Sequence, residues 1–322
     1  MDGKEKKGSN MSRIAAIDLG TNSMRLLLCE VEKGIFKNKK KEIITTRIGK
    51  NLSQSGVMSE KAMNKNIEAL KYFKKMAEDF GAEEIIVIAT SAVRDADNKD
   101  VFIQKTKNET GIDIRVISGD EEAYIGMLGV TYGGNLDESI LIVDVGGGST
   151  ELVLNKDRII KYSASINAGA VRMTESYIMN NPIADNDIKN LEKCLNQLFC
   201  EALSRLSKES IDRIIAIGGT ATTAAAIYYE MEVYDQEKIH NTILNSIFIN
   251  DLFEKLKFMS LYERYKVKGL EKERADIIPA GLYIIKFLMD RLNKESIVVS
   301  EYDNLEGAVI KYSDFIKNMS KY

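Results

Sequence analysis

The sequence is poor in the residues that build metal centres and disulfide frameworks. Its 322 residues include one histidine, three cysteines and no tryptophan. The single histidine excludes any metal site that needs several histidine ligands. The three cysteines show no CxxC spacing and are odd in number, so we expect no disulfide framework and a reducing cytoplasm as the location.

Long apolar stretches and linker sequences are also absent. No apolar run approaches the roughly 18 residues of a membrane span, and the N-terminus lacks the charged and apolar regions of a signal peptide. The formal net charge of −3 gives no overall attraction to nucleic acid or to a membrane, so neither is an expected partner. With Pro182 and Pro279 as the only prolines, no proline-rich linker marks a domain boundary.

The glycine-rich motifs of the common nucleotide-binding loops are missing. No GxxxxGK[ST] or GxGxxG pattern occurs, and both of those loops need a helix directly after the glycines. The chain has instead "IVDVGGGSTELVL" at 142–154, where a strand-like run follows the glycines. This pattern predicts a β-hairpin with a glycine turn.

The same hairpin pattern occurs earlier in the chain. "AAIDLGTNSMRLLL" at 15–28 aligns with it at an offset of 126 residues (144 − 18), which places Asp18 on Asp144 and Ser23 on Ser149. After each hairpin the sequence continues with a third strand and then with helices and strands. The repeat, together with the length of the chain, predicts two α/β domains of similar construction.

The two turns carry groups suited to a phosphate chain and a hard cation. Successive glycine N–H groups can form a concave anion site, to which Ser149 adds a hydroxyl donor. Asp144, with Asp18 as a further candidate, ends its strand before the turn and suits a hydrated Mg²⁺. Glu151 lies across the hairpin from Asp144, whereas the equivalent position of the first hairpin holds Arg25. The sequence therefore predicts a metal-binding turn that faces a phosphate-binding turn.

Some local elements can also be predicted. An amphipathic helix is expected between Ser59, a candidate N-cap, and Gly81, where it should end. A single long helix is expected from about Asp185 to Leu206. The four lysines between positions 37 and 41 form the most basic run, which we interpret as the solvated end of a hairpin.

Six motifs in the same order resemble those of the exopolyphosphatase/guanosine pentaphosphate phosphatase family over residues 13 to about 310. They are "AAIDLGTNSMRLLL", "ATSAVRDADN", "SGDEEA", "VDVGGGSTELVL", "AIGGTATTAAA" and "ERADIIPAG". The resemblance implies the α/β fold of the actin-like superfamily, in which two ribonuclease-H-like domains with mixed five-stranded sheets flank a central cleft. We expect a disordered tail at 1–12, a first domain at 13–125 and a second at 126–304, with a C-terminal helix (about 305–322) packed back on the first.

The resemblance also implies a role for particular residues. Glu122 is expected to position and deprotonate the attacking water, and Asp144 and Glu151 to be the metal-linked carboxylates. The residues expected to bind phosphate are Asn22, Ser23, Arg25, Arg94, Gly146, Gly147, Gly148, Ser149 and Arg274. Arg274 would lie on the far side of the cleft, where it could meet a longer phosphate chain or a base.

Several of these residues have a purely structural alternative. Glu122 could be an exposed glutamate that stabilises the start of a helix, and Arg94 could be a solvated loop arginine. Gly218 and Gly219 could serve only to let the following helix approach its strand, with Thr220 as the N-cap.

The chain departs from the family pattern near its C-terminus. Where the family usually reads "S..GLREG", this chain has "SEYDNLEG" at 300–307, with Asp303 in place of Gly and Leu305 in place of Arg. The lost positive charge should weaken one contact to an anionic substrate or change specificity. The C-terminal histidine-rich domain of longer members is not expected, so the chain resembles the short two-domain members.

The activity implied by the resemblance is hydrolysis of a terminal phosphoanhydride with Mg²⁺ or Mn²⁺ as cofactor. Inorganic polyphosphate is the first expected substrate and guanosine pentaphosphate (pppGpp) the second, with ppGpp as a related ligand, and a homodimer is expected because the family often dimerises. A kinase or ATPase of the same superfamily and a non-catalytic sensor of alarmones or polyphosphate are the alternatives.

Overall fold

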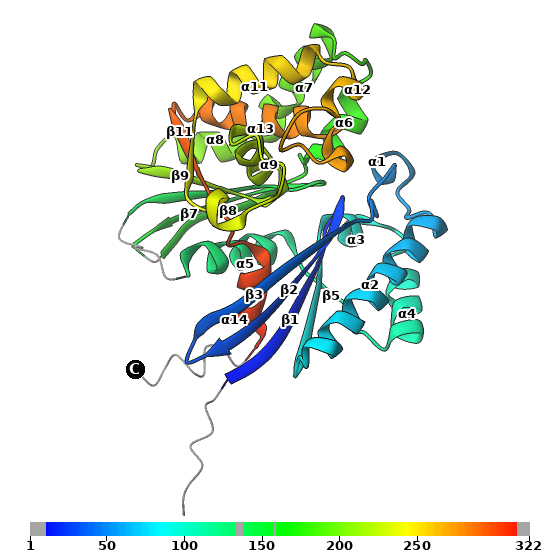
Figure 1. Ribbon diagram of the computed structural model, residues 1–322. Helices are drawn as coiled ribbons and strands as arrows, with labels where there is room; N and C mark the ends of the chain where they lie inside the picture. The colour runs from blue at the N-terminus through cyan, green and yellow to red at the C-terminus, as the bar shows by residue number, and fades with distance from the viewer. Residues whose placement is uncertain (1–10, 133–137, 158, 314–322) are drawn as a thin grey trace, which may run out of the picture.

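The fold is built from two mixed β-sheets, each flanked by helices (Figure 1). The computed structural model describes residues 11–132, 138–157 and 159–313. The expected α/β class with two mixed sheets is confirmed. One sheet has five strands as predicted, whereas the other has six.

The first sheet has the order β3-β2-β1-β4-β5. The strands β1, β2 and β3 are antiparallel, and β4 and β5 continue the sheet in parallel to β1. Their bounds are β1 (Met11–Leu19), β2 (Ser23–Glu32), β3 (Ile35–Thr45), β4 (Glu84–Ala89) and β5 (Arg115–Val116). Since β1 begins at Met11, the last two residues of the expected tail belong to the sheet, and residues 1–10 lie outside the described part.

The second sheet repeats this arrangement and adds one strand. Its order is β10-β11-β9-β6-β7-β8, with an antiparallel hairpin β6-β7-β8 and parallel pairing of β6, β9 and β11. The bounds are β6 (Ile140–Val145), β7 (Thr150–Lys156), β8 (Ile159–Ile166), β9 (Arg213–Ile217), β10 (Thr242–Asn245) and β11 (Ser296–Val299). The additional strand β10 pairs with β11 in the antiparallel sense at the edge, where the repeat has no counterpart.

The helices of the first half cover one face of its sheet. They are α1 (Leu52–Ser55), α2 (Glu60–Phe80), α3 (Ser91–Asp95) and α4 (Lys99–Thr110). Helix α2 has the predicted ends, since the Ser59 side chain accepts a hydrogen bond from the N–H of Ala62 and Gly81 follows with a φ of 76°. Its apolar stripe buries Phe73 and Leu70 against the sheet in the first core.

The second half has the larger set of helices. They are α6 (Ala170–Tyr177), α7 (Asp185–Leu198), α8 (Cys200–Leu206), α9 (Gly218–Tyr228), α10 (Gln236–Ile239), α11 (Ser246–Phe258), α12 (Leu261–Arg264), a 3-10 turn (Lys272–Arg274) and α13 (Ile278–Arg291). The single helix expected from Asp185 to Leu206 is interrupted at Phe199, whose buried ring lies 5.8 Å from that of Phe287.

Two helices lie between the sheets in Figure 1, α5 (Gly119–Thr131) and α14 (Asn304–Tyr312). Helix α14 packs Leu305 and Val309 into one cluster with Ile14 and Ile88 of the first sheet. Helix α5 continues across position 125, where the sequence places the boundary between domains. The domain boundaries therefore stay a prediction, and residues 314–322 of the expected C-terminal helix lie outside the described part.

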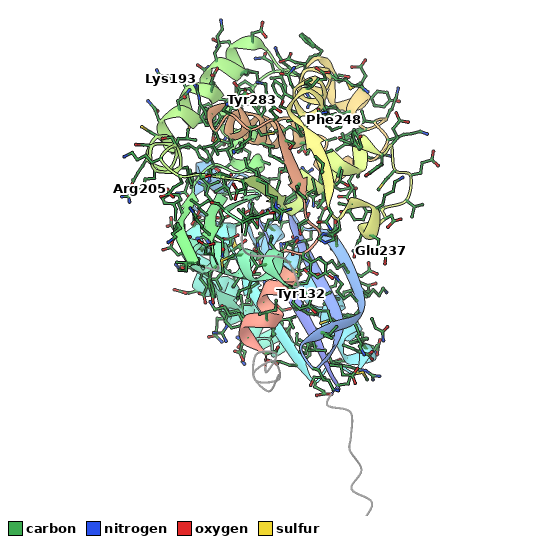
Figure 2. The ribbon with its side chains drawn as sticks, turned by 90° about the vertical axis from the view of Figure 1, so that its left-hand side faces the viewer. Tyr132, Lys193, Arg205, Glu237, Phe248 and Tyr283 are labelled. Carbon is green, nitrogen blue, oxygen red and sulfur yellow. The ribbon has the colours of Figure 1, made fainter. Side chains whose placement is uncertain are left out.

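The lysines of strand β3 include two that face inward, contrary to the prediction of a solvated run. The amino group of Lys41 is buried and lies 3.0 Å from Oε1 of Glu306, and that of Lys39 lies 3.6 Å from the ring centre of Tyr302. Tyr302 in turn stacks on Tyr132 at the end of α5, which Figure 2 shows close to α14. The segment that leads into α14 is thus fastened to the first sheet.

Candidate active site

The two predicted turns have the same backbone geometry. The N–H of Gly20 donates to the carbonyl of Ser23 at 3.1 Å, and the N–H of Gly146 donates to the carbonyl of Ser149 at 3.0 Å. The pairs of facing residues are Asp18 with Arg25 and Asp144 with Glu151. The structure thus confirms the alignment at an offset of 126 residues, down to the register of each hairpin.

In each turn, backbone carbonyl oxygens accept hydrogen bonds from neighbouring elements, and the second turn leaves N–H groups without a partner among the described residues. The carbonyls of Gly146 and Gly147 accept hydrogen bonds from the first N–H groups of α6, at 2.8 to 3.1 Å. The N–H groups of Gly147, Gly148 and Ser149 donate no hydrogen bond within the described residues. In the first turn the carbonyl of Asn22 is likewise occupied, by the N–H of Arg47 at 2.8 Å. Unpaired successive N–H groups are the features of an anion-binding nest.

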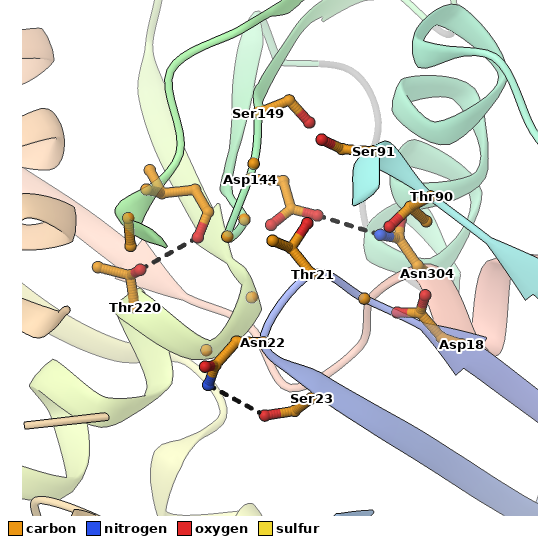
Figure 3. A pocket seen from close by; sticks show the side chains of 18 of the residues that line it. Asp18, Thr21, Asn22, Ser23, Thr90, Ser91, Asp144, Ser149, Thr220 and Asn304 are labelled. Carbon is orange, nitrogen blue, oxygen red and sulfur yellow. Dashed lines mark hydrogen bonds between the residues drawn. The ribbon is translucent and has the colours of Figure 1, made fainter. Parts of the chain in front are cut away.

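The glycines of the second turn also allow the two halves to come close together. A Cβ on Gly147 would lie 2.8 Å from Cβ of Thr21, and one on Gly148 would lie 2.1 Å from Oγ of Ser91. Figure 3 shows the Ser149 and Ser91 side chains facing each other across this contact. The absent side chains therefore make room for the first half of the chain as well as for a ligand.

Most of the predicted site residues line one cavity that is partly open to solvent. Those in its wall are Asp18, Asn22, Ser23, Arg25, Glu122, Asp144, Gly146, Gly147, Gly148, Ser149 and Arg274. Arg94 and Glu151 do not line the cavity but contact residues that do. Arg94 contacts Glu122, and Glu151 pairs with Asp144 across the hairpin.

Three buried carboxylates meet between the turns, and each has one donor from another element. Oε2 of Glu122 accepts from Arg94 at 2.8 Å, and Oε1 of Glu151 accepts from Oγ of Ser165 at 2.6 Å. Oδ2 of Asp144 accepts from the amide of Asn304 at 3.1 Å, as drawn in Figure 3. Glu122 lies in the first turn of α5, but it is buried, which rules out the alternative of an exposed helix-start glutamate.

The charges of these carboxylates oppose one another's ionisation. Burial, followed by the charge of Glu151, raises the pKa of Asp144 to about 8. The same two causes raise the pKa of Glu122 well above its usual value, although Arg94 acts in the opposite direction. Burial also raises the pKa of Glu151. A site that holds several acids at such cost is typical of functional clefts.

In the first hairpin, the aspartate equivalent to Asp144 is paired with a positive charge. Arg25 donates to Oδ2 of Asp18 at 2.5 Å and also forms an ion pair with Asp303. Burial raises the pKa of Asp18, and Arg25 works against that rise. Burial also disfavours ionisation of Asp303, but the charges of Arg25 and Lys41 outweigh it and hold the pKa of Asp303 below its usual value.

The far end of the cavity is formed by the start of α9. Gly218 adopts a φ of 80°, and a Cβ there would lie 2.3 Å from Oδ1 of Asp144. A Cβ on Gly219 would lie 1.9 Å from the guanidinium of Arg274, whose Nε donates to Glu271 at 3.0 Å. These glycines therefore give Asp144 and Arg274 their space, and they line the cavity as well.

Some residues in and around the cavity were not predicted from the sequence. Thr21, Thr90, Ser91 and Asn304 line it, and Arg172 braces it by donating to the carbonyl of Gly148 at 2.7 Å and to Asp95 at 2.6 Å. The internal alignment could have indicated Thr21, which falls on Gly147. Nothing local in the sequence marks Asn304, because it reaches Asp144 from 160 residues away.

The cluster fits a hydrated divalent cation rather than a metal held by protein alone. Within residues 11–132, 138–157 and 159–313, no three histidine, cysteine or acidic side chains are arranged to hold an ion by themselves. However, Oδ1 of Asp18 and Oε2 of Glu151 are buried oxygens without a hydrogen-bond partner. Mg²⁺ commonly binds through one or two carboxylates and completes its shell with water and substrate phosphates.

A protein-family model matches residues 28–314, and its description is the Ppx/GppA phosphatase family. The chain belongs to this family. The family places it among hydrolases that act on phosphoanhydride bonds, as the resemblance of the motifs predicted.

Curated relatives agree with this placement. The chain is 30% identical over 315 residues to Exopolyphosphatase 2 of Mycobacterium tuberculosis, covering 93% of this chain and 98% of the relative. It is 38% identical over 318 residues to a bifunctional 3-dehydroquinate synthase/phosphatase of Fusobacterium nucleatum, covering 95% of this chain. The chain spans only about half, 47%, of the length of that second relative.

Solved Ppx/GppA structures share the fold. The Aquifex aeolicus family member has a TM-score of 0.77 at 29% identity, with 95% of this chain and 98% of that chain covered. An exopolyphosphatase from Cytophaga hutchinsonii has a TM-score of 0.86 at 26% identity, with 95% and 98% covered. The predicted fold class is therefore confirmed. Among the described residues no helix is long and apolar enough to span a membrane.

Proposed function

We propose that this Ppx/GppA protein is an exopolyphosphatase that releases the terminal phosphate of inorganic polyphosphate in a reaction that needs Mg²⁺ or Mn²⁺. The observation that carries the proposal is the position of Glu122. This buried carboxylate lines a cavity whose wall includes the Gly147–Ser149 turn, whose N–H groups have no partner among the described residues, so a base and phosphate-binding donors face the same space.

Glu122 would act on the attacking water. Its pKa is raised above the usual value by burial and by Glu151, and a general base works best when its pKa lies near the operating pH. The ion pair with Arg94 at 2.8 Å fixes the carboxylate in place. The N–H groups of Gly147, Gly148 and Ser149 would hold the terminal phosphate in line with that water.

Asp144 and Glu151 would hold the divalent cation, with Asp18 as a further candidate ligand. When bound, the cation would supply positive charge to the oxygens of the phosphate under attack. Asn304 and Ser165 would keep the carboxylates oriented, since they donate to Asp144 and Glu151.

Guanosine pentaphosphate is the second substrate in this proposal, because it also ends in a phosphoanhydride. Arg274 at the α9 end of the cavity offers a contact for the part of a substrate beyond the reacting phosphates. Binding of ppGpp, a homodimer and a cytoplasmic location belong to the same proposal, and only the family resemblance supports them.

The test is phosphate release from polyphosphate with Mg²⁺ by wild type and by Glu122→Gln. Loss of the base should lower kcat by roughly 10²- to 10⁴-fold. Glu121→Gln is the matched control, because the neighbouring Glu121 faces Lys311 and Tyr312 instead of the cavity and its loss should leave kcat nearly unchanged. Equal activity of Glu122→Gln and wild type would remove Glu122 as the base, and a wild type without phosphate release would overturn the proposed function.

A further inference from the structure

Arg25 lies in the wall of the cavity but has two acidic partners inside the protein. One of its nitrogens donates to Asp18 at 2.5 Å and the other forms an ion pair with Asp303. One positive charge therefore faces two carboxylates. A phosphate that approached Arg25 would have to displace one of them or meet a local charge that is negative overall.

Asp303 is held in this position by the backbone of α14. Its Oδ1 accepts from the N–H of Leu305 at 2.9 Å, and its own N–H donates to Glu306 at 3.2 Å, which together form a capping box. Since these bonds fix the carboxylate at the helix start, its second oxygen stays directed at Arg25. The ion pair is a built feature of the fold rather than one rotamer of a free side chain.

Most of the remaining cations near the cavity also have acidic partners. The cations paired with carboxylates are Arg47 with Asp276, Arg94 with Glu122, Arg274 with Glu271, and Lys39 and Lys41 with Glu306. Lys50, which lines an adjoining cavity, has no ion pair within the described part of the chain. The described cleft therefore lacks a row of free positive charges along which a long polyanion could lie.

We propose that Asp303 is a specificity-determining residue, which neutralises Arg25 and so makes the enzyme prefer short phosphoanhydride substrates over long polyphosphate chains. The inference rests on the proposed function and names the chain length that the same cleft favours. Each further phosphate adds about one negative charge, so the penalty of an uncompensated cleft grows with the number of phosphates inside a Debye length, about 8 to 10 Å.

Asp303→Asn tests the proposal with little change of shape. Asparagine caps helices about as well as aspartate, so α14 should keep its start. The KM for long-chain polyphosphate should fall about tenfold, while that for tripolyphosphate should fall by no more than about threefold. The gain should shrink as salt is added. Glu209→Gln, on the exposed surface after α8, is the control for the same change of net charge and should shift neither KM.

The double variant Arg25→Gln/Asp303→Asn shows whether Arg25 is the cation set free. The tenfold gain should be lost in this variant, because no guanidinium remains to be released. Binding of both polyphosphates, measured by calorimetry with EDTA, checks affinity independently of turnover. Equal shifts for long and short chains, or a gain that survives in the double variant, would overturn the role of Asp303. A wild type that releases phosphate from neither substrate would instead overturn the proposed function.

Discussion

The first and second hairpins share one backbone and differ in the residue across from the aspartate. In the first, Arg25 pairs with Asp18, and in the second, Glu151 stands beside Asp144. The first hairpin therefore pairs one oxygen of its carboxylate, Oδ2 of Asp18, with a cation of the protein. The second brings two acids together in a buried place, where ionisation of one hinders ionisation of the other.

In the proposed function the second hairpin does the chemistry, whereas the first keeps opposite charges paired within the protein. Arg25 opposes the rise that burial causes in the pKa of Asp18, although such a pair adds little net stability over an apolar pair. A buried pair of acids is unfavourable until a cation from solution joins it. The second hairpin thus carries a cost in the empty protein that a bound divalent cation would offset.

The largest expected effect comes from removing the aspartate of each hairpin in turn. Asp144→Asn should lower the rate of phosphate release by roughly 10²- to 10³-fold, because it removes a proposed metal ligand. Asp18→Asn should lower it by less than about tenfold, since Asp303 still holds Arg25. Steady-state rates at saturating Mg²⁺ measure both. Similar losses in the two variants would mean that the hairpins contribute equally to the reaction.

The next largest effect concerns the contribution of the first hairpin's ion pair to the stability of the protein. Arg25→Met should destabilise the protein by about 3 to 5 kcal/mol, because Asp18 would remain buried without a cation and Asp303 would keep only the more distant charge of Lys41. Arg13→Met is the control on the same sheet, where Arg13 is half-exposed and Glu30 keeps a hydrogen bond from Asn38, so the destabilisation should be much smaller. Urea unfolding at pH 7 provides the comparison. A small effect of Arg25→Met would show that the ion pairs of Arg25 do not stabilise the first hairpin.

Much of this contrast was predictable from the sequence, because it is local. The alignment at an offset of 126 residues already places Arg25 at the position equivalent to Glu151. The structure adds the hairpin register, in which Arg25 faces Asp18 and Glu151 faces Asp144. The ends of α2 were also predictable, since Ser59 and Gly81 act through their own backbone neighbours. Periodicity and turn chemistry report such short-range causes well.

Contacts between distant segments were not predictable in the same way. The sequence predicts Lys41 as part of a solvated run, yet its side chain is buried against Glu306. Asn304 likewise has no motif that indicates it as the donor to Asp144. The repeat also gave no sign of the edge strand β10, which has no equivalent in the first sheet. A single sequence lacks a signal for pairs that meet only after both sheets have formed.

The acid pair should also make stability depend on pH. Asp144 has a pKa of about 8 in the folded protein against an ordinary value of 3.8, so the unfolded chain gives up this proton first as pH rises. The contribution of protonated Asp144 to the free energy of unfolding is therefore fully present below about pH 4 and is lost between about pH 4 and pH 8. Asp144→Asn should match wild type near pH 5 more closely than at pH 8, where its Tm should be several degrees higher. Mg²⁺ at pH 8 should raise the Tm of wild type and leave that of the variant unchanged. A Tm difference that does not grow with pH would contradict the raised pKa.

The smallest expected effect concerns the orientation of Glu151. Oγ of Ser165 donates to its Oε1 at 2.6 Å, whereas the buried Oε2 has no hydrogen-bond partner among the described residues and could bind the proposed cation. Ser165→Ala should therefore raise the Mg²⁺ concentration needed for half-maximal activity by roughly tenfold, at the low end of what such supporting bonds are worth. Ser163→Ala, two residues earlier on β8, should leave this concentration unchanged. The Mg²⁺-induced shift in Tm gives a second readout that does not depend on turnover. If both serine variants behave like wild type, the orientation of Glu151 comes from the hairpin backbone alone, and the contrast with Arg25 reduces to the charge of the side chain.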